Sequence, residues 1–161
     1  YAEGISNLDP RPLYPFGSGT SYTTFAYSDP EVSAPTVDVA GTVEYAVTVT
    51  NTGGRGGSEV VQLYLTDPCA EVVRPLKQLI GFAKVDLAAG ASARVTFTVH
   101  ADRFSFTGRD LARIVEPGEV LLSAGHSSED RLEPLVVEVV GGRRRVPEGR
   151  VLTTPVSVEP L

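Results

Sequence analysis

The chain has 161 residues, of which 42% are hydrophobic and 21% charged, which is enough apolar material for one folded core and too much for a disordered chain. Its formal net charge of -6 excludes a strongly basic surface, so we expect no nucleic-acid partner. The single cysteine, Cys69, excludes an internal disulfide and a zinc site built on paired cysteines. No apolar run approaches the roughly 20 residues of a membrane-spanning helix, so we expect a soluble protein with no membrane partner.

The opening residues indicate a junction with another part of a longer polypeptide. The chain contains no methionine, which points to either a removed leader or an excised piece. Residues 1–24 are rich in proline, glycine and aromatic residues and are typical of packed loop, which favours excision. We therefore expect 1–24 to form an extended linker and docking segment.

The first clear strand lies at 43–49, where valine and tyrosine alternate with polar or small residues and share one face. The glycine-rich stretch NTGGRGG at 51–57 predicts a tight, exposed turn. Alternation resumes in EVVQLYLTD at 59–67. Because these two strands flank a short glycine-rich turn, we predict that they pair as a hairpin.

Two prolines interrupt the alternation at 67–76 and predict a loop that crosses between sheets, since proline cannot donate to a strand ladder. A further strand is expected at 78–87. The segment ARVTFTVHA at 93–101 alternates most cleanly, with two valines and a phenylalanine on the inward face. The chain therefore continues as strands separated by turns.

A turn at Pro117 and Gly118 introduces another strand, and LVVEVV predicts one at 135–140. About seven short strands without a capped helical pattern predict an all-β fold, a two-sheet sandwich spanning 25–140. One cysteine and no tryptophan exclude the immunoglobulin signature, so a fibronectin type III-like (immunoglobulin-like) sandwich is the better subclass. The remaining 141–161 is interpreted as a C-terminal tail that either adds an edge strand or stays a linker.

The sequence offers no residues in an arrangement that would support catalysis. The RGG motif at 55–57 is interpreted as part of a turn, because RNA-binding tails repeat that motif among aromatic residues. The three arginines at 143–145 are interpreted as a solvated surface, given the net negative charge of the chain. His100 and His126 have no nucleophile in a recognisable elbow motif. Acidic residues near turns are expected to solvate loops, these being Asp110, Glu116, Glu119, Glu129 and Asp130. We assign no catalytic, cofactor-binding or metal-binding residue and expect no cofactor, leaving open a carbohydrate contact at the loop rim near His126.

The aromatic residues divide into two groups. Tyr45, Phe82 and Phe97 lie on apolar strand faces and are assigned to the core. The others concentrate near the N-terminus, where an exposed cluster would mark a contact surface for another domain. The predicted docking patch consists of Leu13, Tyr14, Phe16, Tyr22 and Phe25.

The same N-terminal block, LYPFGSGTSYTTFAYSD from Leu13 to Asp29, resembles the segment that joins the catalytic core to the C-terminal domain in family 3 glycoside hydrolases. Three further blocks resemble successive strands of that family's fibronectin type III-like domain, in the right order: VTVTNTGGRGGSEVVQLYLTD, VRPLKQLIGFAKVDLAAGASARVTFTV and IVEPGEVLLSAGHSSED. Within the family, the blocks SNLDPRPLYPFG and HADRFSFTGRDLARIVEPGE look most like bacterial β-xylosidases and β-glucosidases. Ser18 and Thr20 depart from the resemblance, since the family usually has larger residues there.

The resemblance implies a parent enzyme that hydrolyses terminal β-linked glucose or xylose with retention, using an aspartate nucleophile and a glutamate acid/base. Neither residue is in this chain. It therefore implies a non-catalytic accessory domain that stabilises or docks on the catalytic domains of the same polypeptide. The alternative is an autonomous carbohydrate- or surface-binding module. A bacterial cytoplasmic protein and a secreted one are equally compatible with the sequence.

Overall fold

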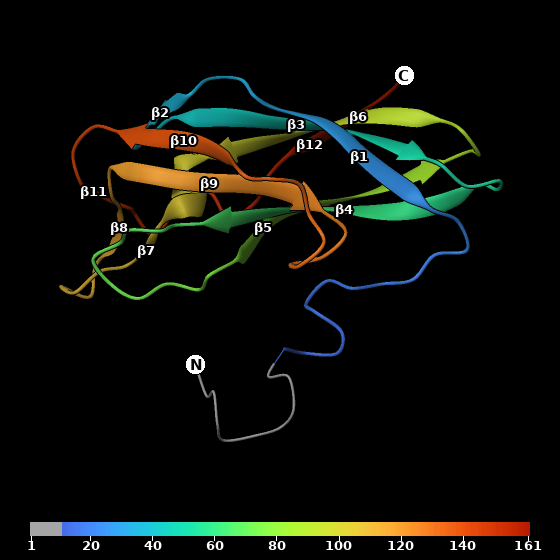
Figure 1. Ribbon diagram of the computed structural model, residues 1–161. Coiled ribbons are helices and arrows are strands. Elements are labelled where there is room, and N and C mark those ends of the chain that lie inside the picture. The colour runs from blue at the N-terminus through green and yellow to red at the C-terminus, as the bar shows by residue number, and fades with distance from the viewer. Residues whose placement is uncertain (1–10) are drawn as a thin grey trace.

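The computed structural model describes residues 11–161, and over that range the chain is a sandwich of β-sheets with one short 3-10 helix, Ala101–Phe104 (Figure 1). The first ten residues of the expected 1–24 segment lie outside the described residues. No helix in the described part of the chain is long and apolar enough to span a membrane. The all-β fold class expected from the sequence is confirmed.

Two main sheets face each other across the core. The first has four antiparallel strands in the order β1 (Phe25–Val32), β3 (Thr42–Asn51), β6 (Ser92–His100) and β12 (Val156–Pro160). The second has five strands in the order β2 (Thr36–Asp38), β10 (Leu135–Val140), β9 (Gly118–Gly125), β4 (Gly57–Thr66) and β5 (Gln78–Leu87). A small sheet at one end has the order β11 (Arg144–Arg145), β8 (Arg113–Val115) and β7 (Phe106–Thr107).

Alternating side chains from the two main sheets form the core. Tyr45 and Phe97 are fully buried, as predicted, and so are the inward residues of β4, such as Leu63. The Ala124 amide donates to the Tyr45 hydroxyl at 3.2 Å, which gives the buried phenol oxygen a hydrogen-bond partner. The described residues form twelve strands rather than about seven, because short strands close the ends and edges of the sandwich.

The predicted hairpin of the strands around 51–57 is wrong. Strand β3 pairs with β1 and β6, whereas β4 pairs with β5 and β9, so 51–57 carries the chain from one sheet to the other. The buried Asn51 side chain holds this crossover: its Nδ2 donates to the carbonyl oxygens of Arg55 (2.8 Å) and Leu87 (3.0 Å). Alternation predicts which face of a strand is buried, but it does not predict the lateral neighbour.

The predicted crossing at 67–76 is also wrong. This loop joins β4 to β5, which are antiparallel neighbours in one sheet, with Gly57 opposite Leu87 and Leu65 opposite Gln78. The prolines keep the loop out of a strand ladder, as expected. They do not decide to which sheet the chain returns.

The assignment of Phe82 to the core is the third error. Phe82 is 67% exposed, on the outer face of the five-stranded sheet. The register between β4 and β5 shifts where Leu63 faces Gly81 and Tyr64 faces Leu79, which leaves Ile80 as an extra residue. Such a bulge reverses the alternation beyond it, so Ile80 points inward and Phe82 outward.

The tail ends in an edge strand, which was one of the two alternatives for 141–161. Strand β12 pairs with β6, from Val156 opposite Phe97 to Pro160 opposite Ala93. Before it, Asp102 accepts a hydrogen bond from the Val151 amide at 2.9 Å. The tail therefore lies against the sandwich rather than extending away from it.

Candidate docking site

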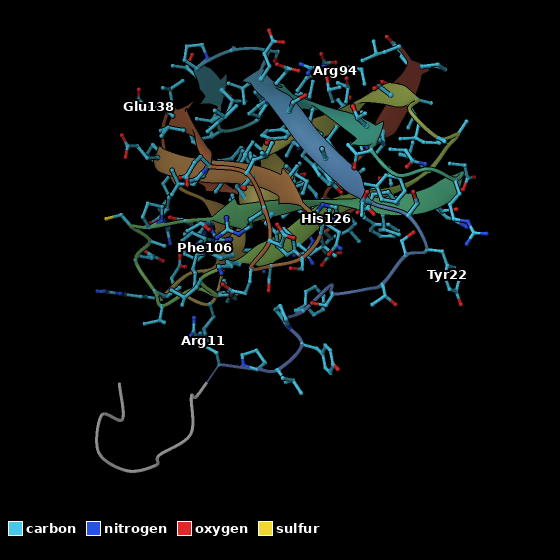
Figure 2. The ribbon with its side chains drawn as sticks, turned by 45° about the vertical axis from the view of Figure 1, so that its right-hand side comes forward. Arg11, Tyr22, Arg94, Phe106, His126 and Glu138 are labelled. Atoms are coloured by element: carbon cyan, nitrogen blue, oxygen red, sulfur yellow. The ribbon has the colours of Figure 1, made fainter. Side chains whose placement is uncertain are left out.

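The segment from Arg11 to Thr24 contains no helix or strand, and it runs along the lower side of the molecule before entering β1 (Figure 1). Four of the five predicted docking residues are largely exposed: Leu13 86%, Tyr14 79%, Phe16 66% and Tyr22 92%. Figure 2 shows Tyr22 on the outside of the molecule, away from the strands. Phe25 differs, because it is half-buried as the first residue of β1 and packs against the core.

The segment is attached to the sandwich at two places, and the first is Phe16 and Gly17. Gln62 Nε2 donates to the Gly17 carbonyl oxygen at 2.9 Å, and the Ser128 amide donates to that of Phe16 at 2.9 Å. Gly17 has a φ of +83°, and a Cβ there would lie 2.0 Å from Gln62 Oε1. Only glycine fits this contact without a displacement of Gln62.

The second attachment lies just before β1. The Thr23 hydroxyl donates to Asn51 Oδ1 at 2.8 Å, and the Thr52 amide donates to the Thr24 carbonyl oxygen at 2.8 Å. Asn51 therefore holds both the crossover between the sheets and the end of the docking segment. Between the two attachments, residues 18–22 form an exposed arch, a name used below for these five residues.

A polar cluster where β1, β4 and the loop after β9 meet supports the first attachment. Glu59 Oε1 on β4 accepts a hydrogen bond from the Tyr27 hydroxyl on β1 at 2.8 Å and lies 2.8 Å from His126 Nδ1. The Tyr27 and His126 rings are in edge-to-face contact, with centroids 4.5 Å apart. Gln62 Nε2 also donates to the His126 carbonyl oxygen at 2.5 Å. The loop that begins at His126 is thus tied to the same glutamine that binds the docking segment.

The charges in this cluster favour a structural role. The hydrogen bond from His126 to Glu59 raises the pKa of His126, although burial opposes it, and the charges of Glu59 and Asp130 add to the rise. Burial and the nearby Glu59 carboxylate raise the pKa of Tyr27, so its phenol stays neutral and donates. The cluster holds the Glu59 carboxylate between two partners, whereas glycoside hydrolysis uses two carboxyl groups across an open substrate site.

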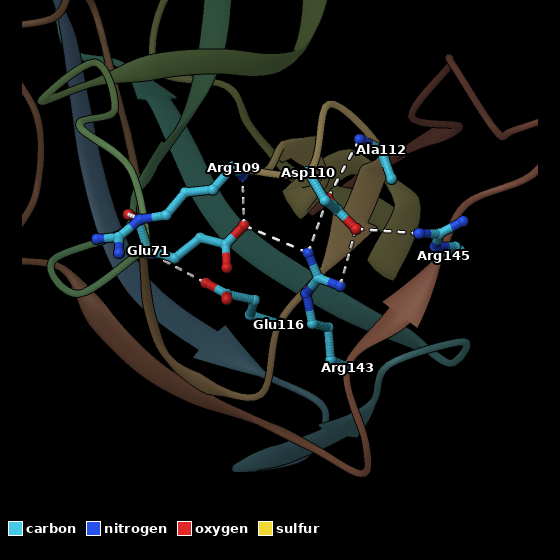
Figure 3. A network of polar contacts seen from close by, with 7 residues as sticks. All are labelled: Glu71, Arg109, Asp110, Ala112, Glu116, Arg143 and Arg145. Carbon is cyan, nitrogen blue, oxygen red and sulfur yellow. Dashed lines mark hydrogen bonds and ion pairs between the residues drawn. The ribbon is translucent and has the colours of Figure 1, made fainter.

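A second polar cluster joins three loops near β8 and β11 (Figure 3). Glu71 accepts a hydrogen bond from the Arg109 amide at 2.8 Å, and Arg143 bridges Asp110 at 3.0 Å and Glu71 at 3.4 Å. Arg145 adds an ion pair with Asp110 at 3.0 Å. Hydrogen bonds from Arg143 and the Ala112 amide lower the pKa of Asp110 to about 2. Two of the three arginines at 143–145 thus pair with acidic loop residues.

Sequence reasoning did not identify the residues that hold the docking segment in place, directly or through the loop that begins at His126: Asn51, Glu59, Gln62, His126 and Ser128. One signal was available, since Gln62 interrupts the apolar run of β4 and is nevertheless buried. A buried polar side chain within a strand requires a hydrogen-bond partner. For Gln62 that partner comes from a segment 45 residues away, which local sequence does not indicate.

Comparison with known proteins defines the class to which this fold belongs. Residues 59–128 match the family model of the fibronectin type III-like domain. The chain is 43% identical over 121 residues to a β-xylosidase of Formosa agariphila, which covers 75% of this chain and 17% of the relative. The crystal structure of a β-glucosidase from Listeria innocua with isofagomine superposes with a TM-score of 0.81 at 35% identity, covering 88% of this chain and 20% of that one.

A family 3 β-glucosidase from Bifidobacterium adolescentis superposes with a TM-score of 0.72 at 36% identity, over 86% of this chain and 20% of that one. This chain belongs to the fibronectin type III-like domains of family 3 glycoside hydrolases, as the sequence resemblance indicated. The chain spans only 17% of the length of the curated relatives from Formosa agariphila that it matches.

Proposed function

We propose that this chain is a non-catalytic, C-terminal accessory domain of a β-glycosidase that acts on terminal β-linked glucose or xylose, and that it stabilises the catalytic domains by docking on them. The observation that carries the proposal is the docking segment itself. Four large apolar side chains are at least 66% exposed on a segment whose backbone is held to the sandwich at Phe16 and Gly17 and again just before β1. Contiguous exposed apolar side chains of this size mark an interface.

The two attachments make the segment suitable for docking. A free linker would lose backbone and side-chain entropy on docking, which opposes association. Here the hydrogen bonds from Gln62 and Ser128 to the segment already order its backbone around Phe16. Docking of the aromatic side chains therefore does not have to offset the entropy lost in ordering this part of the backbone.

The partner in this proposal is the rest of the same polypeptide. The relatives that match this chain are β-xylosidases and β-glucosidases several times its length. The aspartate nucleophile and glutamate acid/base of a retaining mechanism would then lie in that part, outside this chain. The accessory domain contributes stability and leaves the chemistry of bond cleavage to the catalytic domains.

The test compares the parent enzyme with a variant carrying Tyr14→Ala and Phe16→Ala. We expect a lower melting temperature and an unchanged kcat for a nitrophenyl glycoside. The same substitutions in the 161-residue chain alone should leave its melting temperature nearly unchanged, because both side chains are exposed. Val136→Ser, at an exposed valine on β10 outside the docking segment, is the matched control. An unchanged melting temperature of the parent variant would contradict docking.

Calorimetric titration of the isolated chain separates docking from the alternative of an autonomous carbohydrate-binding module. Xylan, β-glucan and their oligosaccharides are the ligands to be titrated. The docking proposal predicts no measurable heat of binding. Saturable binding to one of them would favour the module.

A further inference from the structure

A groove of about 660 Å³ lies between the arch and the outer face of β4 and β5. Its apolar walls come from both sides: Val60, Leu79 and Phe82 on the strands, and Phe16 and Phe25 at the two ends of the arch. Phe82 is the one aromatic residue of β5, and it is 67% exposed on the outer face, opposite Gln62 of β4. The groove therefore exposes apolar surface next to the docking residues.

The arch does not fill the groove. Its residues Ser18, Gly19, Thr20 and Ser21 line the groove, and all four are small. A Cβ added to Gly19 would meet no atom within 4 Å. Apolar surface that stays open beneath a tethered segment is available to a group from outside the described residues.

The charge at one end of the groove limits which partner fits. Glu59 and Asp130 line this end together with His126, and no lysine or arginine is among the described residues that line the groove. Glu59 is held by His126 and Tyr27, whereas no ion pair joins Asp130 to another residue between positions 11 and 161. A cationic group on the partner would therefore be attracted to this end.

We propose that the groove receives an aliphatic or aromatic side chain, flanked by a lysine or arginine, from the part of the parent polypeptide outside this chain. This inference rests on the proposed docking function and adds a second contact to it. Two observations favour the parent polypeptide as the source. Phe16 belongs to both the docking patch and the groove wall, so the two surfaces are continuous. A covalently linked domain is also present at high effective concentration.

The principal test is Phe82→Ser in the parent enzyme, with Val136→Ser as the control on β10. We expect Phe82→Ser to lower the melting temperature of the parent by about 2 to 4 °C, and the control to leave it unchanged. Phe82→Ser in the isolated chain should cause little change, since the side chain is 67% exposed there. An unchanged parent melting temperature for Phe82→Ser would overturn the groove contact.

Two further variants separate the possible outcomes. Leu13→Ser with Tyr14→Ala removes docking residues that do not line the groove. If this pair lowers the melting temperature of the parent and Phe82→Ser does not, the docking function stands and the groove inference fails. If neither variant does, both fail. Asp130→Lys should lower the melting temperature of the parent more at low salt than at high salt. An unchanged melting temperature would overturn the proposal that a lysine or arginine of the partner lies near Asp130.

Titration of the isolated chain with xylobiose and cellobiose tests a sugar as the alternative occupant, since a groove of this volume is also large enough for a small ligand. We expect no binding. Binding that Phe82→Ser abolishes would assign the groove to a sugar and overturn the inference.

Discussion

Glu59 and His126 are joined by a 2.8 Å contact between Oε1 and Nδ1, and this contact connects the sandwich to the docking segment. Two residues beyond the histidine, the Ser128 amide donates to the Phe16 carbonyl oxygen at 2.9 Å. The position of Phe16 therefore depends on a loop that is itself held by Glu59. Substitutions at Glu59 or His126, and a change in the protonation of His126, should alter the docking segment as well as the stability of the sandwich.

The Glu59–His126 contact predicts a pH dependence of stability. The pKa of His126 is raised in the folded state, mainly by its hydrogen bond to Glu59. Because folding raises the pKa of His126, the stability that the contact contributes is fully present below the unfolded-state pKa of 6.5. It is lost as pH rises through the pKa of the folded state. His126→Gln should therefore lower the free energy of unfolding by about 1 to 2 kcal/mol near pH 5.5, and by less near pH 8.5. Urea denaturation at both pH values measures this, and an equal loss at both would contradict it.

Gly17 and Gly19 form a matched pair for testing the first attachment. Gly17→Ala introduces a Cβ at a φ of +83° and within 2.0 Å of Gln62, at a cost of about 1 to 3 kcal/mol to the attached state. We expect the Ser128 amide to exchange faster with deuterium in this variant, because its partner at Phe16 moves away. Gly19→Ala meets no atom within 4 Å and should leave the exchange of Ser128 unchanged. Equal exchange rates in the two variants would argue against the attachment.

Asn51 is expected to be among the most sensitive polar positions. Its fully buried side chain donates to two carbonyl oxygens and accepts from the Gly53 amide and the Thr23 hydroxyl. Asn51→Ala leaves buried backbone groups without partners and should cost about 3 kcal/mol in urea denaturation. The control is Thr24→Ala, which removes an exposed hydroxyl contact and should change stability little. Similar losses for both variants would contradict a central role for Asn51.

Two aspartates should respond differently to loss of charge. Asp102 is 6% exposed and pairs with Arg144, so Asp102→Asn should cost about 3 kcal/mol. Asp110→Asn breaks only exposed ion pairs and should leave the melting temperature nearly unchanged at physiological salt.

The contribution of Asp102 to the stability of the fold should also depend on pH. Burial alone would raise the pKa of Asp102, but hydrogen bonds from Arg144 and the Val151 amide lower it. Because folding lowers the pKa of Asp102, the stability that its charge contributes is present above the ordinary pKa of 3.8. It is lost as pH falls through the pKa of the folded state. The difference in melting temperature between wild type and Asp102→Asn should therefore shrink below about pH 4. A constant difference would show that the charge of Asp102 does not matter.

The sequence by itself determined the fold class and most of the strands. Alternation placed Tyr45 and Phe97 in the core, and LVVEVV coincides with β10. Four blocks of sequence also indicated the family that the comparisons show. These features depend on a two-residue period or on short local motifs, so they are readable along the chain without knowledge of the partners of each strand.

Tertiary structure alone decided which strands are neighbours and where the docking segment is held. The stretch at 51–57 crosses between sheets because buried hydrogen bonds of Asn51 hold it there, although its glycines resemble those of a hairpin turn. Ile80 and Phe82 are two residues apart but face opposite sides of the sheet, because a bulge at Ile80 shifts the register. Gln62 holds Gly17 across 45 residues of sequence. Each of these depends on contacts between distant residues, which a local pattern does not encode.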